Sequence, residues 1–149
     1  MITRRDLLVA AVAMGATLSI VALAQTAEKP LMRSSVFQWN SLPVEQRPTG
    51  ERRQVFDAPT ATLDRLECHI TTVNPGQALH AAHRHVEEEL MIVKEGTIES
   101  VQNGQTNLVE AGGIIFEGSG ELHGVRNAGT NRATYYVFKW FPPGLVKAK

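Results

Sequence analysis

The sequence predicts an all-β protein, a sandwich or barrel of short strands. Two observations support this class. Runs of alternating or β-branched apolar residues recur along the second half of the chain, and turns rich in Gly and Asn separate them. In addition, no segment after the first two dozen residues has a convincing helical period. Many short strands broken by such turns are typical of all-β sandwiches and barrels.

The expected strands follow one another from residue 52 to residue 141. Asp57-Ala58-Pro59-Thr60 is a turn after the first of them. Asn103-Gly104 is a two-residue hairpin signal, because both residues tolerate the positive φ angles of a tight turn. Pro142-Pro143-Gly144 ends the last strand. The expected strands are 52–56, 66–73, 89–93, 97–102, 108–110, 114–116, 123–126 and 133–141.

Residues 25–62 form an expected N-terminal arm with edge strands, ahead of a barrel over residues 63–142 and a tail over 143–149. The arm contains several prolines, which remove backbone donors and end helices, and a short strand is expected near Ser35–Trp39. Such a segment wraps the barrel edge or pairs with a neighbouring subunit. Strand exchange into a homodimer is therefore a hypothesis.

Residues 1–24 have the pattern of a signal peptide. A basic start is followed by an apolar run and by Ala22-Leu23-Ala24, which has the small-x-small form of a cleavage site. The stretch from Thr3 to Leu8 resembles a twin-arginine export signal of bacteria. We expect cleavage after Ala24, a periplasmic or secreted protein, and no stable membrane association afterwards. The alternative is an uncleaved anchor, since the apolar run is just long enough to span a bilayer.

Composition is that of one globular domain. The 149 residues are 43% hydrophobic and 20% charged, and fifteen basic residues balance fifteen acidic ones. Because no strong field favours a polyanion, we expect no nucleic-acid partner. The single cysteine, Cys68, cannot form an internal disulfide and alternates with apolar strand residues, so we expect a buried small hydrophobe.

His83, His85, Glu89 and His123 are the candidate metal-binding residues. On a strand, His83 and His85 would project from one face because side chains alternate, and Glu89 keeps the even spacing. Imidazole and carboxylate groups suit a divalent first-row transition metal. Together the residues have the appearance of a four-ligand site.

The spacing around these residues resembles the two motifs of the cupin superfamily. His83, His85, Glu89 and Gly96 fit the first motif, and the second is fitted by Gly112, Gly120, His123 and Asn127. Two turn positions depart from the pattern, since Gly118 stands where the family has proline and six residues rather than five separate Gly76 from His83. The resemblance covers about residues 66 to 140.

The resemblance implies a double-stranded β-helix of jelly-roll type, a small single-domain cupin. It further implies that His83, His85, Glu89 and His123 bind one divalent transition metal ion, of which Mn, Fe, Zn, Ni and Cu all remain open. Met91 and Val93 share the parity of Glu89 and are expected to form an apolar floor beneath the ion.

Other polar and aromatic residues have ordinary expected roles. His80 and Arg126 are expected at the surface, His69 as a structural histidine, and Asn127 as the tie of a turn. Glu87 and Glu88 are expected to be solvated turn charges. Tyr136, Phe138 and Trp140 share one strand face, where they pack in the core or form a pocket wall.

Function is less determined than fold, because cupins host many reactions. The first hypothesis is a metalloenzyme, dioxygenase-like or isomerase-like, that acts on a small oxygen-rich substrate. The alternative is a module that uses the metal to bind a small molecule such as a sugar without turnover. No catalytic residue is identified from the sequence.

Overall fold

The computed structural model describes residues 29–145, so the expected signal peptide lies outside the described residues. Within that range, no helix has the length and apolar character needed to cross a membrane. The described elements are one 3₁₀ turn and nine strands: η1 (Trp39–Ser41), β1 (Val44–Arg47), β2 (Gly50–Ala58), β3 (Arg65–Val73), β4 (Glu88–Glu95), β5 (Thr97–Gln102), β6 (Gln105–Glu110), β7 (Ile114–Glu117), β8 (His123–Asn127) and β9 (Ala133–Phe141).

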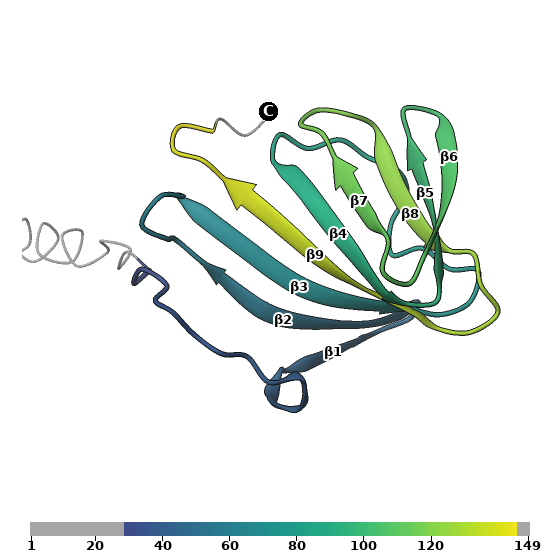
Figure 1. The fold of residues 1–149 in the computed structure, drawn as a ribbon, viewed down its shortest axis with the longest axis horizontal. Coiled ribbons are helices and arrows are strands. Elements are labelled where there is room, and N and C mark those ends of the chain that lie inside the picture. The colour runs from purple at the N-terminus through teal and green to yellow at the C-terminus, as the bar shows by residue number, and fades with distance from the viewer. Residues whose placement is uncertain (1–28, 146–149) are drawn as a thin grey trace, which may run out of the picture.

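The strands form two antiparallel sheets. The larger sheet has the order β1-β2-β3-β9-β4-β7, and the smaller has the order β6-β5-β8. Figure 1 shows the larger sheet curving across the molecule, with the smaller sheet beside its β4 and β7 end. The last strand, β9, pairs between β3 and β4, so residues far apart in sequence become neighbours. The all-β, double-stranded β-helix prediction is confirmed.

The core lies on the inner face of the larger sheet, between it and the smaller sheet. In β4 alternate residues are buried, as the period of two predicts, and they pack with Tyr135 and Val137 of β9, Ile98 of β5 and Ile115 of β7. Met91 and Val93 belong to this cluster, at 3% and 1% exposure, and both lie on the face of β4 that carries Glu89. The buried apolar members are Val73, Met91, Val93, Ile98, Ile115, Ala133, Tyr135 and Val137.

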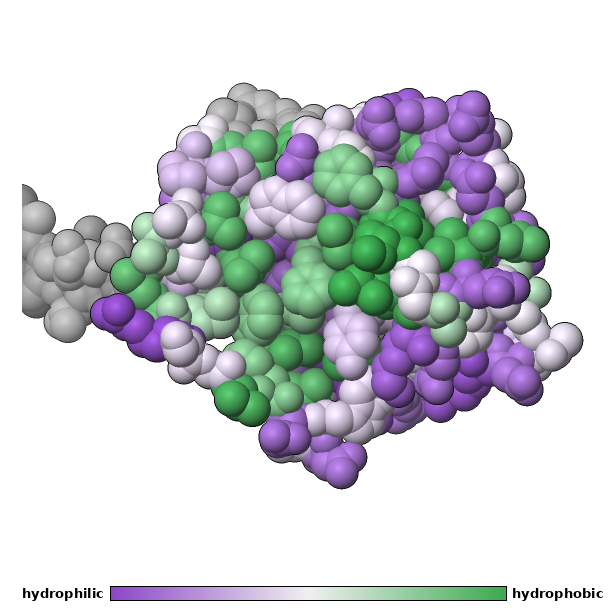
Figure 2. Space-filling view, viewed as in Figure 1, coloured by the Kyte–Doolittle hydropathy of each residue, from purple (hydrophilic) through white to green (hydrophobic). Residues whose placement is uncertain are grey.

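The other residues of β9 face outward. Tyr136, Phe138 and Trp140 alternate with the core residues, and the Trp140 ring stacks on exposed Phe116 of β7 at 6.2 Å. Apolar side chains accordingly gather over this face in Figure 2. Tyr136 and Phe138 form part of a pocket wall, as one of the two expectations had it, and this pocket lies on the outer face beside the N-terminal arm.

The N-terminal arm covers part of the same outer face. Phe37 packs on Phe56 at 5.5 Å, and the Trp39 ring lies under the cations of Arg53 and Lys94. The expected strand near residues 35–39 is wrong, because this stretch is irregular and ends in η1; the pairing strand is β1. Cys68, on β3, is buried as expected, and burial raises the pKa of its thiol to about 12.

Two turns depend on their glycines. Asn103 and Gly104, with φ of 48° and 86°, close the β5–β6 hairpin as the sequence predicts. Gly96 has a φ of 82°, and a Cβ there would lie 2.7 Å from the Ala133 Cβ. Only glycine satisfies both conditions at the turn between β4 and β5.

Candidate metal centre

The site is built where the loop before β4 meets β8. His83 and His123 form an isolated antiparallel bridge, in which His83 N donates to His123 O at 2.9 Å and His123 N donates to His83 O at 3.0 Å. The residues from Arg84 to Glu87 are not in a strand. The expectation of a regular strand through His83 and His85 is therefore wrong, although both side chains reach the same place.

The three histidines meet in one cluster. One ligand atom from each of His83, His85 and His123 can be chosen so that all lie within 4.8 Å of one another. The His123 and His85 Nε2 atoms are 3.0 Å apart, and the ring centroids are separated by 4.5 to 5.3 Å. Such separations leave room for an ion between the nitrogens at ordinary coordination distances of about 2 Å.

Backbone carbonyls orient two of the rings. Nδ1 of His85 donates to the Glu87 carbonyl at 2.7 Å, and Nδ1 of His123 donates to the Glu121 carbonyl at 2.9 Å. Fixing the proton on Nδ1 leaves the Nε2 lone pair free to bind a cation. Nδ1 of His83 is buried and has no hydrogen-bond partner among the residues that the structure describes. A bound cation or its associated water would satisfy such an atom.

The surroundings keep two rings neutral. Burial and the neighbouring imidazoles lower the pKa of His83, and burial lowers that of His123. The Glu89 hydrogen bond raises the pKa of His85. Neutral imidazole is the form that binds a metal, so the histidine set fits a divalent first-row transition ion.

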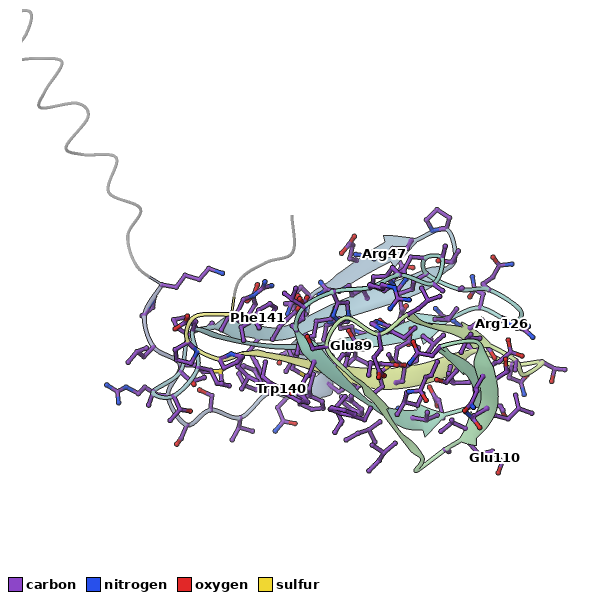
Figure 3. All side chains as sticks on the ribbon, turned by 90° about the horizontal axis from the view of Figure 1, so that it is seen from above. Arg47, Glu89, Glu110, Arg126, Trp140 and Phe141 are labelled. Atoms are coloured by element: carbon purple, nitrogen blue, oxygen red, sulfur yellow. The ribbon has the colours of Figure 1, made fainter. Side chains whose placement is uncertain are left out.

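Glu89 lies next to the triad. Its side chain projects from β4 toward the molecular interior, visible near the centre of Figure 3, and is 6% exposed. Its Oε2 is 3.4 Å from His85 Nε2. Burial alone would raise the pKa of this carboxyl, but the His85 hydrogen bond and the ammonium of Lys139 outweigh burial and hold the pKa at about 2. Glu89 is therefore an anion at the edge of the triad.

Lys139 was missed by the sequence analysis. Its Nζ is 2.8 Å from Glu89 Oε2 and 3.4 Å from His85 Nε2, and it comes from the inner face of β9. Lys139 follows buried Tyr135 and Val137 at intervals of two residues. Because side chains alternate along a strand, this spacing could have placed Lys139 inside the barrel. The site thus contains a cation of its own in addition to the four expected ligands.

Glu117 extends the line of charges. The strand register places Glu67, Lys139, Glu89 and Glu117 side by side on β3, β9, β4 and β7. Glu117 is 1% exposed; Gln102 donates to its Oε2 at 3.0 Å, and its Oε1 has no partner among the described residues. Burial raises the pKa of this carboxyl to about 7. A buried carboxyl that is half protonated near neutrality therefore lies beside the centre.

A small cavity of about 50 Å³ opens beside the histidines. His83 and His123 line it together with Lys139, and Met91 and Tyr135 provide apolar surface. His69 of β3 also lines it, with Nδ1 3.1 Å from Glu67 Oε1. His69 does not join the triad. The cavity has room for a few water-sized groups, since about 10–15 Å³ of such space holds one water.

The remaining candidates divide between surface and turn. His80 is exposed at the rim, with its ring 4.4 Å from that of His83, and Arg126 is exposed and paired with Glu99. Asn127 ties a turn as expected, because its amide donates to Val73 O and Asn131 O. Each of these three side chains is where the sequence placed it.

Glu87 and Glu88 are not simply solvated. Glu87 Oε1 is 3.9 Å from Lys139 Nζ, and Glu88 accepts a hydrogen bond from Trp140 Nε1 at 2.8 Å. Both side chains are partly buried. The expectation of free turn charges is therefore wrong for both.

The comparisons with known proteins agree with the fold. Residues 69–139 match a family model described as a cupin domain. No curated protein matches the sequence. The family model covers just under half of the chain, and its range lies within the strands β3 to β9.

Three solved structures illustrate the likeness. An RmlC-like cupin from Shewanella frigidimarina has a TM-score of 0.60 at 17% identity, over 74% of this chain and 95% of that chain. The polyketide cyclase RemF from Streptomyces resistomycificus has a TM-score of 0.60 at 24% identity, over 75% and 82%. A predicted oxalate decarboxylase from Thermotoga maritima has a TM-score of 0.57 at 19% identity, over 72% and 99%. At these identities the likeness is one of fold.

Proposed function

We propose that this cupin-fold protein is a metalloenzyme that acts on a small, oxygen-rich anion. His83, His85 and His123 would hold a divalent transition ion, with Glu89 as the fourth ligand. The observation that carries the proposal is the convergence of three imidazoles, from two segments some forty residues apart, within 4.8 Å of one another. A structural ion would not need the adjoining cavity.

The bound ion would supply positive charge that polarises an oxygen of the substrate, or a redox centre if it is iron, manganese, nickel or copper. The protein supplies the surroundings of the ion. Met91, Tyr135 and Val137 provide an apolar wall that lowers the local dielectric and strengthens charge interactions in the cavity. Dioxygenase-like and isomerase-like chemistry both suit such a site, and the identity of the metal separates them.

Lys139 narrows the class of substrate. Its ammonium lines the cavity and is paired with Glu89, at 2.8 Å. If Glu89 turns to bind the ion, the ammonium loses this partner and becomes available to an anion. A carboxylate next to a carbonyl or hydroxyl could then contact Lys139 with one group and the metal with the other. Oxalate is such a carboxylate, and it occurs in the name of one fold neighbour. The likeness to that neighbour supports only the fold of this chain. The proposal of an anionic substrate rests on Lys139.

We also propose that the protein is exported. Support comes from the sequence of residues 1–24, with its paired arginines, apolar run and Ala-Leu-Ala site. A twin-arginine route carries folded proteins and would allow the metal to be loaded before export. N-terminal sequencing of protein recovered from a bacterial periplasm tests this proposal, with Gln25 expected as the first residue.

A ligand-binding and turnover experiment tests the enzymatic function. The chain loaded with zinc or with ferrous iron is titrated with oxalate, pyruvate and a neutral sugar, while its melting temperature and the products are followed. We expect the two carboxylates to raise the melting temperature and the sugar to leave it unchanged. Stabilisation by the sugar alone, without any product from the three compounds, would support the non-catalytic binding module instead.

A further inference from the structure

We infer that His69, oriented by Glu67, is a general base that faces the cavity of the metal centre. The inference rests on the proposed function, because it assigns the proton-transfer group of that reaction. Both residues come from β3, a strand that carries none of the expected metal ligands.

The position of His69 is fixed by the sheet. On the inner face of β3, Glu67 pairs across from Lys139 of β9, and His69 pairs across from Val137. The His69 side chain therefore projects into the same interior as Lys139. The cavity is lined by His69, Lys139, His83 and His123 together, so a molecule within it could touch both the metal and the His69 ring.

The orientation of the ring is fixed by Glu67. Its carboxylate oxygen Oε1 lies 3.1 Å from His69 Nδ1, and the carboxylate is held in turn by Arg52 at 2.6 Å and by Arg65 at 3.6 Å. The His69 hydrogen bond lowers the pKa of Glu67 and the two arginines add to the effect, so Glu67 is an anion. A carboxylate can only accept a hydrogen bond, which places the neutral ring's proton on Nδ1 and the lone pair on Nε2.

Nε2 of His69 is free to accept a proton. No hydrogen bond to this atom occurs among residues 29–145, and 13% of the side chain remains accessible. Because His69 lines the cavity, a molecule bound there could contact this atom. Arg52 already neutralises Glu67, so the imidazole is not required as a counter-ion. The pair has the arrangement of a base held by an orienting carboxylate.

The step that this arrangement allows is a proton transfer. For pyruvate, Nε2 would take a proton from the methyl group, and the electron pair of that C–H bond would form the C=C bond of the enolate while the carbonyl π pair moves to oxygen. The imidazolium would then return a proton to the carbon. Glu67 stabilises the imidazolium without taking its proton, and Lys139 is placed to contact the carboxylate of pyruvate.

The tautomer of His69 gives the first test, and it needs no activity. Long-range ¹H–¹⁵N spectra of the full chain at about pH 8, with and without zinc, should show His69 protonated at Nδ1 and unprotonated at Nε2. Glu67→Ala should shift the ring toward the Nε2–H form. A wild-type ring already protonated at Nε2 would overturn the inference whether or not zinc binds.

Proton exchange gives the second test. In D₂O, zinc-loaded wild type should accelerate loss of the methyl ¹H signal of pyruvate, and His69→Gln should lower that acceleration by about 100-fold while zinc content stays at the wild-type value. Arg126→Gln, which changes an exposed side chain outside this cavity, is the control. Zinc-loaded wild type without acceleration, or His69→Gln as fast as wild type, would overturn the role of His69. Failure of the wild type to retain zinc would instead contradict the proposed function.

Discussion

The backbones of His83 and His123 exchange two hydrogen bonds, of 2.9 and 3.0 Å, and so join the two halves of the metal centre. The ligands are separated by forty residues, yet their Cα positions are fixed as in a short antiparallel ladder. The backbone therefore holds two of the three clustered histidines next to each other.

The close packing under this bridge leads to the first prediction. A Cβ on Gly124 would lie 3.0 Å from the Ala82 Cα, so Gly124→Ala should push the segment bearing His83 away from β8. We expect metal affinity to fall about tenfold, as for other changes that misplace ligands. Calorimetric titration with zinc measures this. Arg126→Ala, an exposed change in the same strand, should leave the affinity at the wild-type value; equal losses in both variants would contradict the explanation.

Lys139 gives the second prediction. Lys139→Met should weaken binding of oxalate to the zinc-loaded protein by about 10- to 100-fold, because a charge-assisted contact contributes about 1.5–3 kcal/mol. The same variant should bind zinc at least as tightly as wild type, since Glu89 loses its competing ion pair. Lys139→Arg keeps the charge and should retain most of the oxalate affinity. An unchanged oxalate affinity in the Met variant would remove Lys139 from the substrate site.

The fold was largely predictable because its signals are local. Alternation located the core strands, and Asn103-Gly104 located a hairpin, without knowledge of any partner strand. The irregular path of His85 was not predictable, because it depends on hydrogen bonds to distant residues, such as the one from Gly120 N to the His85 carbonyl. The proline-rich arm gave a false strand at residues 35–39, where aromatic packing against β2 decides the conformation.

The clustering of the three histidines was predictable from the sequence, and the other charged residues around them were not. The spacing of His83, His85 and His123 can be recognised in the sequence, whereas Lys139 and His69 reach the cavity because β9 pairs with β3 and β4. In β9 the aromatic residues of the outer face are the prominent sequence signal, and Lys139 lies on the opposite, inner face. Pairing order is a tertiary property, and periodicity does not encode it.

Glu117 gives a prediction about stability and pH in the metal-free protein. Its pKa is raised from 4.5 to about 7, so the protonated form is favoured in the folded state. Its stabilising contribution is complete below about pH 4.5 and is lost as the pH rises through about 7.

Glu117→Gln does not titrate and keeps an acceptor for Gln102. Relative to wild type, we expect the variant to gain on the order of 2 kcal/mol in the free energy of unfolding between pH 5 and pH 8. Urea unfolding in the presence of a chelator measures the difference. A constant difference between the two proteins at both pH values would show that Glu117 is ionised throughout.

Acidification should remove the metal. His85 has a raised pKa and takes a proton first, and His83 and His123, whose pKa values are lowered, follow at lower pH. A protonated imidazole cannot bind the ion, so the metal retained after dialysis should decline as the pH falls and be largely lost at about pH 5, where an unperturbed imidazole is protonated. Circular dichroism at each pH separates release from unfolding. Full retention at pH 5 by folded protein would exclude histidine ligation.

The metal content of the purified full chain tests the central claim most directly. Elemental analysis after dialysis at neutral pH should find one transition-metal ion per chain in wild type and in His80→Ala, and none in His83→Ala or His123→Ala, all four proteins remaining folded by circular dichroism. Equal metal content in wild type and in the His123→Ala protein would contradict the account, because the ion would then be bound without the histidine that joins the two motifs.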